Sequence, residues 1–126
     1  LPISEAARDL LATAPRNADG TPVIDWIFLG MGEDGHVASL FPGEKISAIE
    51  SPSVYRAVVA SKPPPHRITL GYPTLAAARE VWTLVSGAGK ERALADSLAP
   101  GNATPFARVL TSHPHTKIFS DIKPAA

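Results

Sequence analysis

An apolar run, Val23–Leu29, passes directly into a glycine-rich polar stretch, and this succession sets narrow limits on the fold. Apart from Asp25 the run has no polar residue, which is typical of a strand buried on both faces in a parallel sheet that helices cover. A second run, Val81–Val85, also leads into a turn with two glycines. In sheets of this kind the polar residues that follow the strands gather at one edge, where ligands bind.

The rest of the chain alternates between the helical and the extended pattern. Apolar residues at helical spacing predict a first helix around residues 7–14, with Ser4 as its N-cap. Further strands are expected at residues 55–60, 67–72 and 117–119, and further helices at 75–79 and 91–98. Strands that alternate with helices predict a three-layer α/β fold with a mainly parallel sheet flanked by helices.

Composition narrows the classes of function. The chain has 126 residues, of which 44% are hydrophobic, and this is enough for a single domain over residues 1–126. The formal net charge is zero, which argues against a general attraction to nucleic acid or to an anionic membrane. There is no cysteine, and no apolar run reaches the about 20 residues of a spanning helix. A cytoplasmic protein that exists as a monomer or a weak homo-oligomer is expected.

The glycines of the first turn match a nucleotide-binding pattern, but their context does not. Gly30, Gly32 and Gly35 follow a strand in the order of a dinucleotide fingerprint. That fingerprint opens a long helix, whereas Phe41-Pro42 ends any helix here early. Asp34 would also face the negative pyrophosphate. A dinucleotide site is therefore not expected.

Asp34 and His36 lie two residues apart on this glycine-rich loop. A carboxylate beside an imidazole determines which ring nitrogen carries the proton, and the other nitrogen is then free to take a proton from water. That is what ester hydrolysis by a general base requires. The spacing is equally compatible with a turn aspartate and with a histidine that the backbone satisfies.

Two further segments are candidates for anion binding. The stretch Lys62–Thr69 contains three prolines that would hold His66 and Arg67 on a stiff arm, and arginine suits bidentate phosphate contacts. The turn Ser86–Lys90 joins a strand to a helix, where free N–H groups and the helix dipole attract anions. It is not a P-loop, because Leu84 and Glu91 occupy positions that need glycine and serine or threonine. The side chains of His66, Arg67 and Lys90 are also compatible with simple solvent exposure.

The stretch Gly30–Pro42, read with Lys62–Thr69 and Ser86–Lys90, resembles the family of 6-phosphogluconolactonases and glucosamine-6-phosphate isomerases or deaminases. The tail Ser39-Leu40-Phe41-Pro42 is similar to the lactonase form of the motif. The resemblance implies a Rossmann-like sugar-phosphate isomerase/deaminase fold and the hydrolysis of 6-phospho-D-glucono-1,5-lactone in the oxidative pentose phosphate pathway. The alternative is a deaminase or isomerase on the same scaffold.

The resemblance also implies roles for particular residues. His36 is the general base and Asp34 its partner. The substrate and its phosphate are expected to contact a wider set, comprising Gly30, Gly32, Gly35, His66, Arg67 and Lys90. No cofactor is expected, and no metal site, because no cysteine or carboxylate cluster completes the pair His113 and His115.

The resemblance covers only the C-terminal portion of the family's domain. The glycine-serine-rich turn and the acidic, arginine-bearing segment of the N-terminal half have no counterpart in this sequence. A fold that is incomplete on its N-terminal side is therefore expected, with an uncovered sheet edge and uncovered apolar surface.

Overall fold

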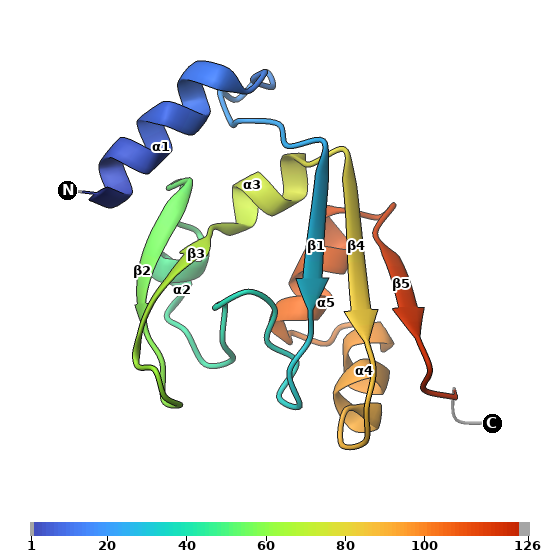
Figure 1. Cartoon of the computed structure of the whole chain (residues 1–126). Helices are drawn as coiled ribbons and strands as arrows, with labels where there is room; N and C mark the ends of the chain where they lie inside the picture. Colours follow the sequence, from blue (N-terminus) through green and yellow to red (C-terminus); the bar gives the residue numbers. More distant parts are fainter. Residues whose placement is uncertain (1, 124–126) are drawn as a thin grey trace.

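The computed structural model describes residues 2–123 and is built around a parallel sheet (Figure 1). Its strands are β1 (Trp26–Gly30), β4 (Glu80–Val85) and β5 (Lys117–Ser120), in the order β1-β4-β5. Both strand pairs are parallel, so each needs a crossover. These crossovers contain α3 (Tyr72–Ala77), and then α4 (Glu91–Leu98) and α5 (Pro105–Ser112). The predicted α/β fold, with a parallel sheet flanked by helices, is confirmed.

The first crossover also carries a separate antiparallel hairpin. Strands β2 (Tyr55–Val59) and β3 (His66–Leu70) form their own two-stranded sheet, preceded by the short helix α2 (Ile46–Ile49). Helix α1 (Pro2–Thr13) packs against β2 (Figure 1). The prediction of Ser4 as N-cap is wrong, because the helix already includes Pro2, whose fixed φ suits a first turn.

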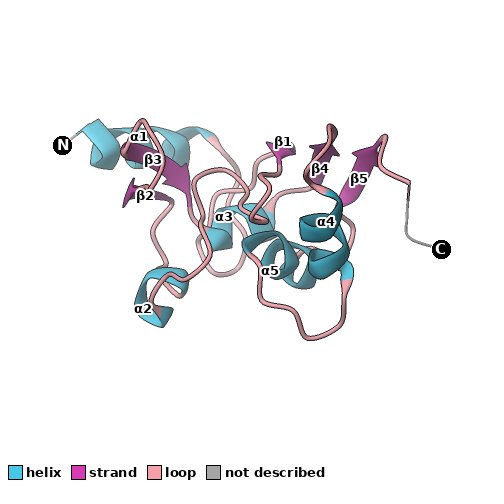
Figure 2. Ribbon diagram, turned by 90° about the horizontal axis from the view of Figure 1, so that it is seen from below, coloured by secondary structure: helices cyan, strands magenta, loops and turns pink. Residues whose placement is uncertain are grey.

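The hydrophobic core lies between the parallel sheet and its helices. In Figure 2 the three strands form one layer, and α3, α4 and α5 lie together on one side of it. The side chains that meet there are Ile27, Leu29, Val81 and Val85 from the strands and Leu75, Ala93, Leu94, Phe106 and Val109 from the helices. Because each strand alternates its side chains, one face of β1 and β4 supplies this core.

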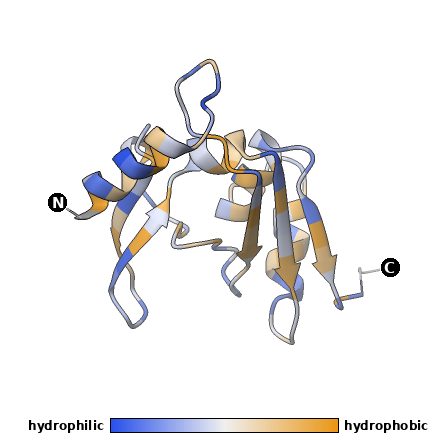
Figure 3. Cartoon of the chain, turned by 45° about the horizontal axis from the view of Figure 1, so that its top comes forward, coloured by the Kyte–Doolittle hydropathy of each residue, from blue (hydrophilic) through white to orange (hydrophobic). Residues whose placement is uncertain are grey.

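The opposite face of the sheet is aromatic and open to solvent. Trp26 is 45% exposed and Phe28 is 64% exposed, although both belong to the apolar run that predicted a strand buried on both faces. The prediction that this strand is buried on both faces is therefore wrong. Trp82 lies 4.6 Å from Trp26 and 4.8 Å from Phe119 between ring centroids, so the rings cover one another only partly. Figure 3, coloured by the hydropathy of each residue, shows hydrophobic bands along the strands of the parallel sheet.

His113 has a structural place in this fold. It is buried, with Nε2 2.7 Å from the carbonyl of Ala78 and Nδ1 3.0 Å from the hydroxyl of Thr116. Nε2 therefore joins the end of α5 to the segment before β4, and Nδ1 joins it to the residue before β5. His115 is exposed.

Candidate active site

The loop that follows β1 is folded back on itself and anchored in the core. The N–H of Gly32 donates to the carbonyl of His36 at 2.9 Å, and the N–H of Gly35 donates to the carbonyl of Gly32 at 3.0 Å. Met31 before the turn and Val37 and Leu40 after it are buried, so the chain on either side of the turn is held by packing. This arrangement presents the polar residues of the turn at the carboxyl edge of the sheet.

Asp34 and His36 are in direct contact. Oδ1 of Asp34 lies 2.6 Å from Nδ1 of His36 and accepts the backbone N–H of the same residue at 3.0 Å. Burial acts to raise the pKa of Asp34, but the hydrogen bonds and the charge of His36 outweigh it and hold that pKa below its ordinary value. An ionised Asp34 favours the proton on Nδ1, which leaves the lone pair of Nε2 available.

The glycines of this loop differ in what surrounds them. A Cβ on Gly32 would lie 2.1 Å from Cε1 of His36, so the imidazole occupies the space above this residue. Gly35 has φ +84°, and a Cβ there would lie 2.9 Å from Cβ of Thr104. A Cβ on Gly30 would meet open space. Gly32 and Gly35 are thus required by close contacts within the chain.

His66 and Arg67 begin β3, and Arg67 reaches toward the loop. Its Nε donates to the carbonyl of Pro64 at 2.9 Å, and its guanidinium lies 5.3 Å from the ring centroid of Phe41. That ring in turn lies 4.7 Å from the imidazole of His36. The structure therefore links Arg67 to His36 through Phe41, while His66 is exposed on the hairpin. The involvement of Phe41 was not foreseen, because the two segments are far apart in sequence.

The turn after β4 lies beside the His36 loop, because β1 and β4 are neighbouring parallel strands. Lys90 directly precedes α4, and the N–H of Gly89 donates to Oε2 of Glu91 at 3.0 Å. A Cβ on Gly89 would lie 2.5 Å from Oε1 of Glu33. Two carboxylates thus lie at a turn that was predicted to bind an anion. Glu33 lies close to Gly89 because of the register between β1 and β4, and no local feature of the sequence predicts this contact.

Residues 2–118 match the sequence profile described as Glucosamine-6-phosphate isomerases/6-phosphogluconolactonase. The chain belongs to this family.

Individual relatives support the family assignment. The 6-phosphogluconolactonase of Mycobacterium tuberculosis is 45% identical over 79% of this chain and 40% of its own length. The 6-phosphogluconolactonase of Homo sapiens is 40% identical over 92% of this chain and 45% of its own length. The chain therefore spans less than half of the curated relatives that it matches.

Solved structures agree on the fold. The structure of 6-phosphogluconolactonase from Trypanosoma brucei superimposes with a TM-score of 0.79 at 29% identity, covering 94% of this chain and 49% of that one. A monomeric glucosamine-6-phosphate deaminase superimposes with a TM-score of 0.60 at 22% identity, covering 76% and 44%, and shows the shared fold alone.

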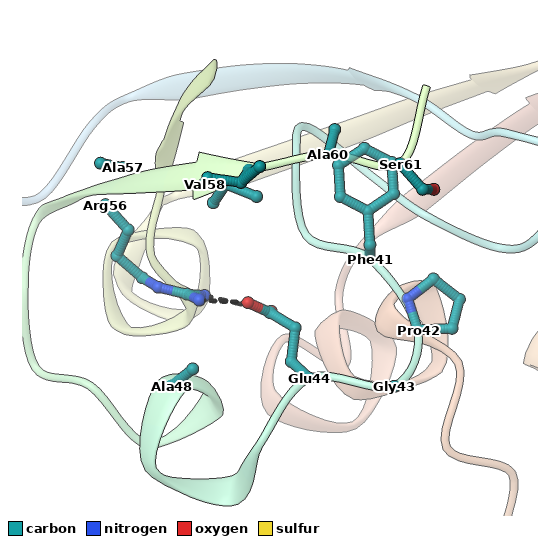
Figure 4. A pocket seen from close by; sticks show the side chains of 11 residues that line it. Phe41, Pro42, Gly43, Glu44, Ala48, Arg56, Ala57, Val58, Ala60 and Ser61 are labelled. Carbon is teal, nitrogen blue, oxygen red and sulfur yellow. Dashed lines mark hydrogen bonds and ion pairs between the residues drawn. The ribbon is translucent and has the colours of Figure 1, made fainter. Parts of the chain in front are cut away.

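A cavity of about 410 Å³ lies on the hairpin side of the loop that carries His36 (Figure 4). It is lined by Phe41, the following loop and β2, and Arg56 pairs there with Glu44 in a largely buried ion pair. Burial, together with the charge of Glu44, raises the pKa of nearby Tyr72 to about 12. Because His36 does not line this cavity, we attribute the cavity to the packing of the hairpin against the loop and not to the candidate active site.

Within residues 2–123 no helix combines the length and the apolar character that crossing a membrane requires. Over the same residues no three His, Cys, Asp or Glu side chains are grouped as metal ligands would be.

Proposed function

We propose that the protein to which this chain belongs hydrolyses 6-phospho-D-glucono-1,5-lactone to 6-phosphogluconate in the oxidative pentose phosphate pathway. The observation that carries the proposal is the 2.6 Å contact between Asp34 and Nδ1 of His36 at the carboxyl edge of the sheet. The relatives named 6-phosphogluconolactonase at 40–45% identity support it. The activity is proposed for the whole protein, since the matched relatives are more than twice as long as the matched region.

The chemistry follows from the arrangement of the pair. Nε2 of His36 takes a proton from a water molecule as its oxygen adds to the lactone carbonyl. Asp34 stabilises the imidazolium that forms, because its carboxylate is negative and accepts a hydrogen bond from Nδ1–H. The ring C–O bond then breaks, the imidazolium returns the proton to the departing ring oxygen, and the new carboxylic acid ionises. One water is consumed and one proton is released, with no redox change.

We propose that the phosphate of the substrate is bound near the turn after β4. Lys90 supplies a positive charge there, and Arg67 and His66 are further candidates on the hairpin. Gly30, which has open space above it, allows the substrate to approach the backbone. No cofactor is required, because a lactone is already reactive toward water.

We also propose a cytoplasmic location, a monomer or weak homo-oligomer, and no nucleic-acid partner. The zero net charge and the absence of cysteine support these assignments. Cell fractionation and sedimentation analysis would test them, and a membrane-pellet location or a stable high-order oligomer would contradict them.

Proton release after adding freshly prepared lactone near neutral pH tests the reaction. The protein should accelerate proton release above the spontaneous rate, and His36→Ala should lower the catalysed rate about 10²–10⁴-fold. His115→Ala, which alters an exposed histidine, serves as the control. A loss below tenfold in His36→Ala would remove this residue from the chemistry. Without acceleration by the folded protein, ammonia release from glucosamine 6-phosphate would indicate the deaminase alternative.

A further inference from the structure

A chain of hydroxyl groups joins α4 to the first turn of α5. The hydroxyl of Ser97 donates to the carbonyl of Ala93 at 2.7 Å and lies 2.7 Å from Oγ1 of Thr104. Because Ser97 has only one proton to donate, the Thr104 hydroxyl is the donor to Ser97. Oγ1 of Thr104 also accepts the N–H of Ala107 at 3.0 Å and so caps α5. Ser97 is 4% exposed, so water does not compete for this chain.

The same first turn of α5 holds the peptide between the two proposed catalytic residues. The N–H of Phe106, a fully buried residue, donates to the carbonyl of Gly35 at 3.1 Å. Thr104 packs against Gly35 from the side, since a Cβ on Gly35 would lie 2.9 Å from Cβ of Thr104 and 3.1 Å from its Cγ2. Gly35 is the residue between Asp34 and His36. A shift of α5 would therefore displace Gly35 and, with it, the neighbouring residues Asp34 and His36.

We propose that Thr104 is a positioning residue for the Asp34–His36 pair, acting through Gly35. A single oxygen, Oδ1 of Asp34, accepts both the backbone N–H and the Nδ1 proton of His36. This double acceptance requires a narrow range of backbone geometry around Gly35, which the first turn of α5 supplies. The consequence for catalysis rests on the proposed function, whereas the consequence for the imidazole does not.

The chain offers variants that separate positioning from general stability. Thr104→Val keeps the shape against Gly35 and removes the hydroxyl, while Thr104→Ser keeps the hydroxyl. Ser97→Ala removes the buried partner without touching the cap of α5. Thr111→Val is the matched control, because the Thr111 hydroxyl donates to the carbonyl of Ala107 at 3.0 Å on the same helix.

The test combines NMR of the imidazole with steady-state kinetics. In the unaltered protein the His36 Nδ1 proton should be held by Asp34 and give a downfield signal. Thr104→Val and Ser97→Ala should broaden or lose that signal. These two variants should lower kcat about tenfold and keep KM within twofold. A tenfold loss is smaller than the roughly 10²-fold loss that a displacement of 1 Å can produce. Thr104→Ser and Thr111→Val should keep both the signal and kcat.

Two results would overturn the positioning role. The first is an unchanged His36 signal and an unchanged kcat in both Thr104→Val and Ser97→Ala. The second is an equal loss in Thr111→Val, which would indicate general destabilisation. If the unaltered protein does not hydrolyse the lactone but Thr104→Val still changes the imidazole signal, the proposed function fails and the positioning role stands.

Discussion

One oxygen of Asp34 serves His36 twice, accepting its backbone N–H at 3.0 Å and facing its Nδ1 at 2.6 Å. The hydrogen bond from the backbone N–H holds the carboxylate beside the imidazole ring. The side chains of Asp34 and His36 keep 35% and 22% exposure, so water and substrate have access to the pair.

Replacing Asp34 by asparagine should separate orientation from charge. The amide oxygen of Asp34→Asn keeps the shape but does not stabilise an imidazolium, so kcat should fall about 10²-fold, at the lower end of the range for acid–base catalysis. Steady-state kinetics would measure the fall, with Asp19→Asn as an exposed control. Full activity in Asp34→Asn would show that the proton on Nδ1 needs no charged partner.

The pH dependence of the pair follows from the lowered pKa of Asp34. A carboxyl whose folded pKa lies below its ordinary value of 3.8 contributes stability that is present above 3.8 and is lost as pH falls through the folded value. The Asp34 contact should therefore persist throughout the neutral and mildly acidic range. NMR titration of the carboxyl carbon would measure this pKa, and a midpoint above 3.8 would contradict the contact.

Gly32 and Gly30 form a matched pair for testing the glycine loop. Gly32→Ala places a methyl group 2.1 Å from the imidazole of His36, and the ring must rotate away from it. We expect kcat to fall at least tenfold, with little change in melting temperature, because a side-chain end absorbs the clash. Gly30→Ala enters the open space by which the substrate is proposed to approach, so it should raise KM while keeping kcat within about threefold. Equal activity in the two variants would contradict the position of the ring.

Opposite charges near Gly89 should have opposite effects on the binding of the phosphate. Lys90→Ala should raise KM by an amount equivalent to about 1.5–3 kcal/mol, the contribution of a charge-assisted contact. Glu33→Gln removes a carboxylate that lies against Gly89 and should lower KM roughly two- to fivefold, since exposed charges interact by about 0.2–1 kcal/mol. Lys45→Ala, an exposed lysine outside this turn, is the control. An unchanged KM in Lys90→Ala would place the phosphate elsewhere.

The two faces of β1 should respond differently to the same substitution. Ile27 is 7% exposed and Phe28 is 64% exposed. Ile27→Thr should destabilise the fold by about 2–4 kcal/mol, because it leaves a cavity and buries a hydroxyl. Phe28→Thr should change stability by less than about 1 kcal/mol and should reduce self-association and the binding of apolar dyes. Chemical denaturation and sedimentation would measure these effects, and a larger loss in Phe28→Thr would mean that the aromatic face is buried.

Features that depend on neighbours in sequence were predicted well. The helix expected at residues 91–98 is α4 (Glu91–Leu98), because its apolar spacing is local. Asp34 and His36 are in contact, which the family resemblance implied and the spacing alone left open. The alternation of strands and helices likewise predicted the parallel sheet.

Features that depend on tertiary packing were not predictable in the same way. The contact of Thr104 with Gly35, and that of Glu33 with Gly89, join segments more than fifty residues apart. They exist because β4 pairs with β1 in a particular register and because α5 packs under the loop. Helix α5, which Thr104 caps, was not predicted from the sequence, and neither was the contact of Thr104 across the fold.

The amino-acid sequence by itself determined the order of the elements, because apolar periodicity and glycine act within a few residues, and its motifs carried the resemblance to the family. Only the tertiary structure decided which face of β1 is buried and which distant residues support the turn. An apolar strand has two hydrophobic faces in sequence, and burial depends on whether other parts of the fold cover each of them.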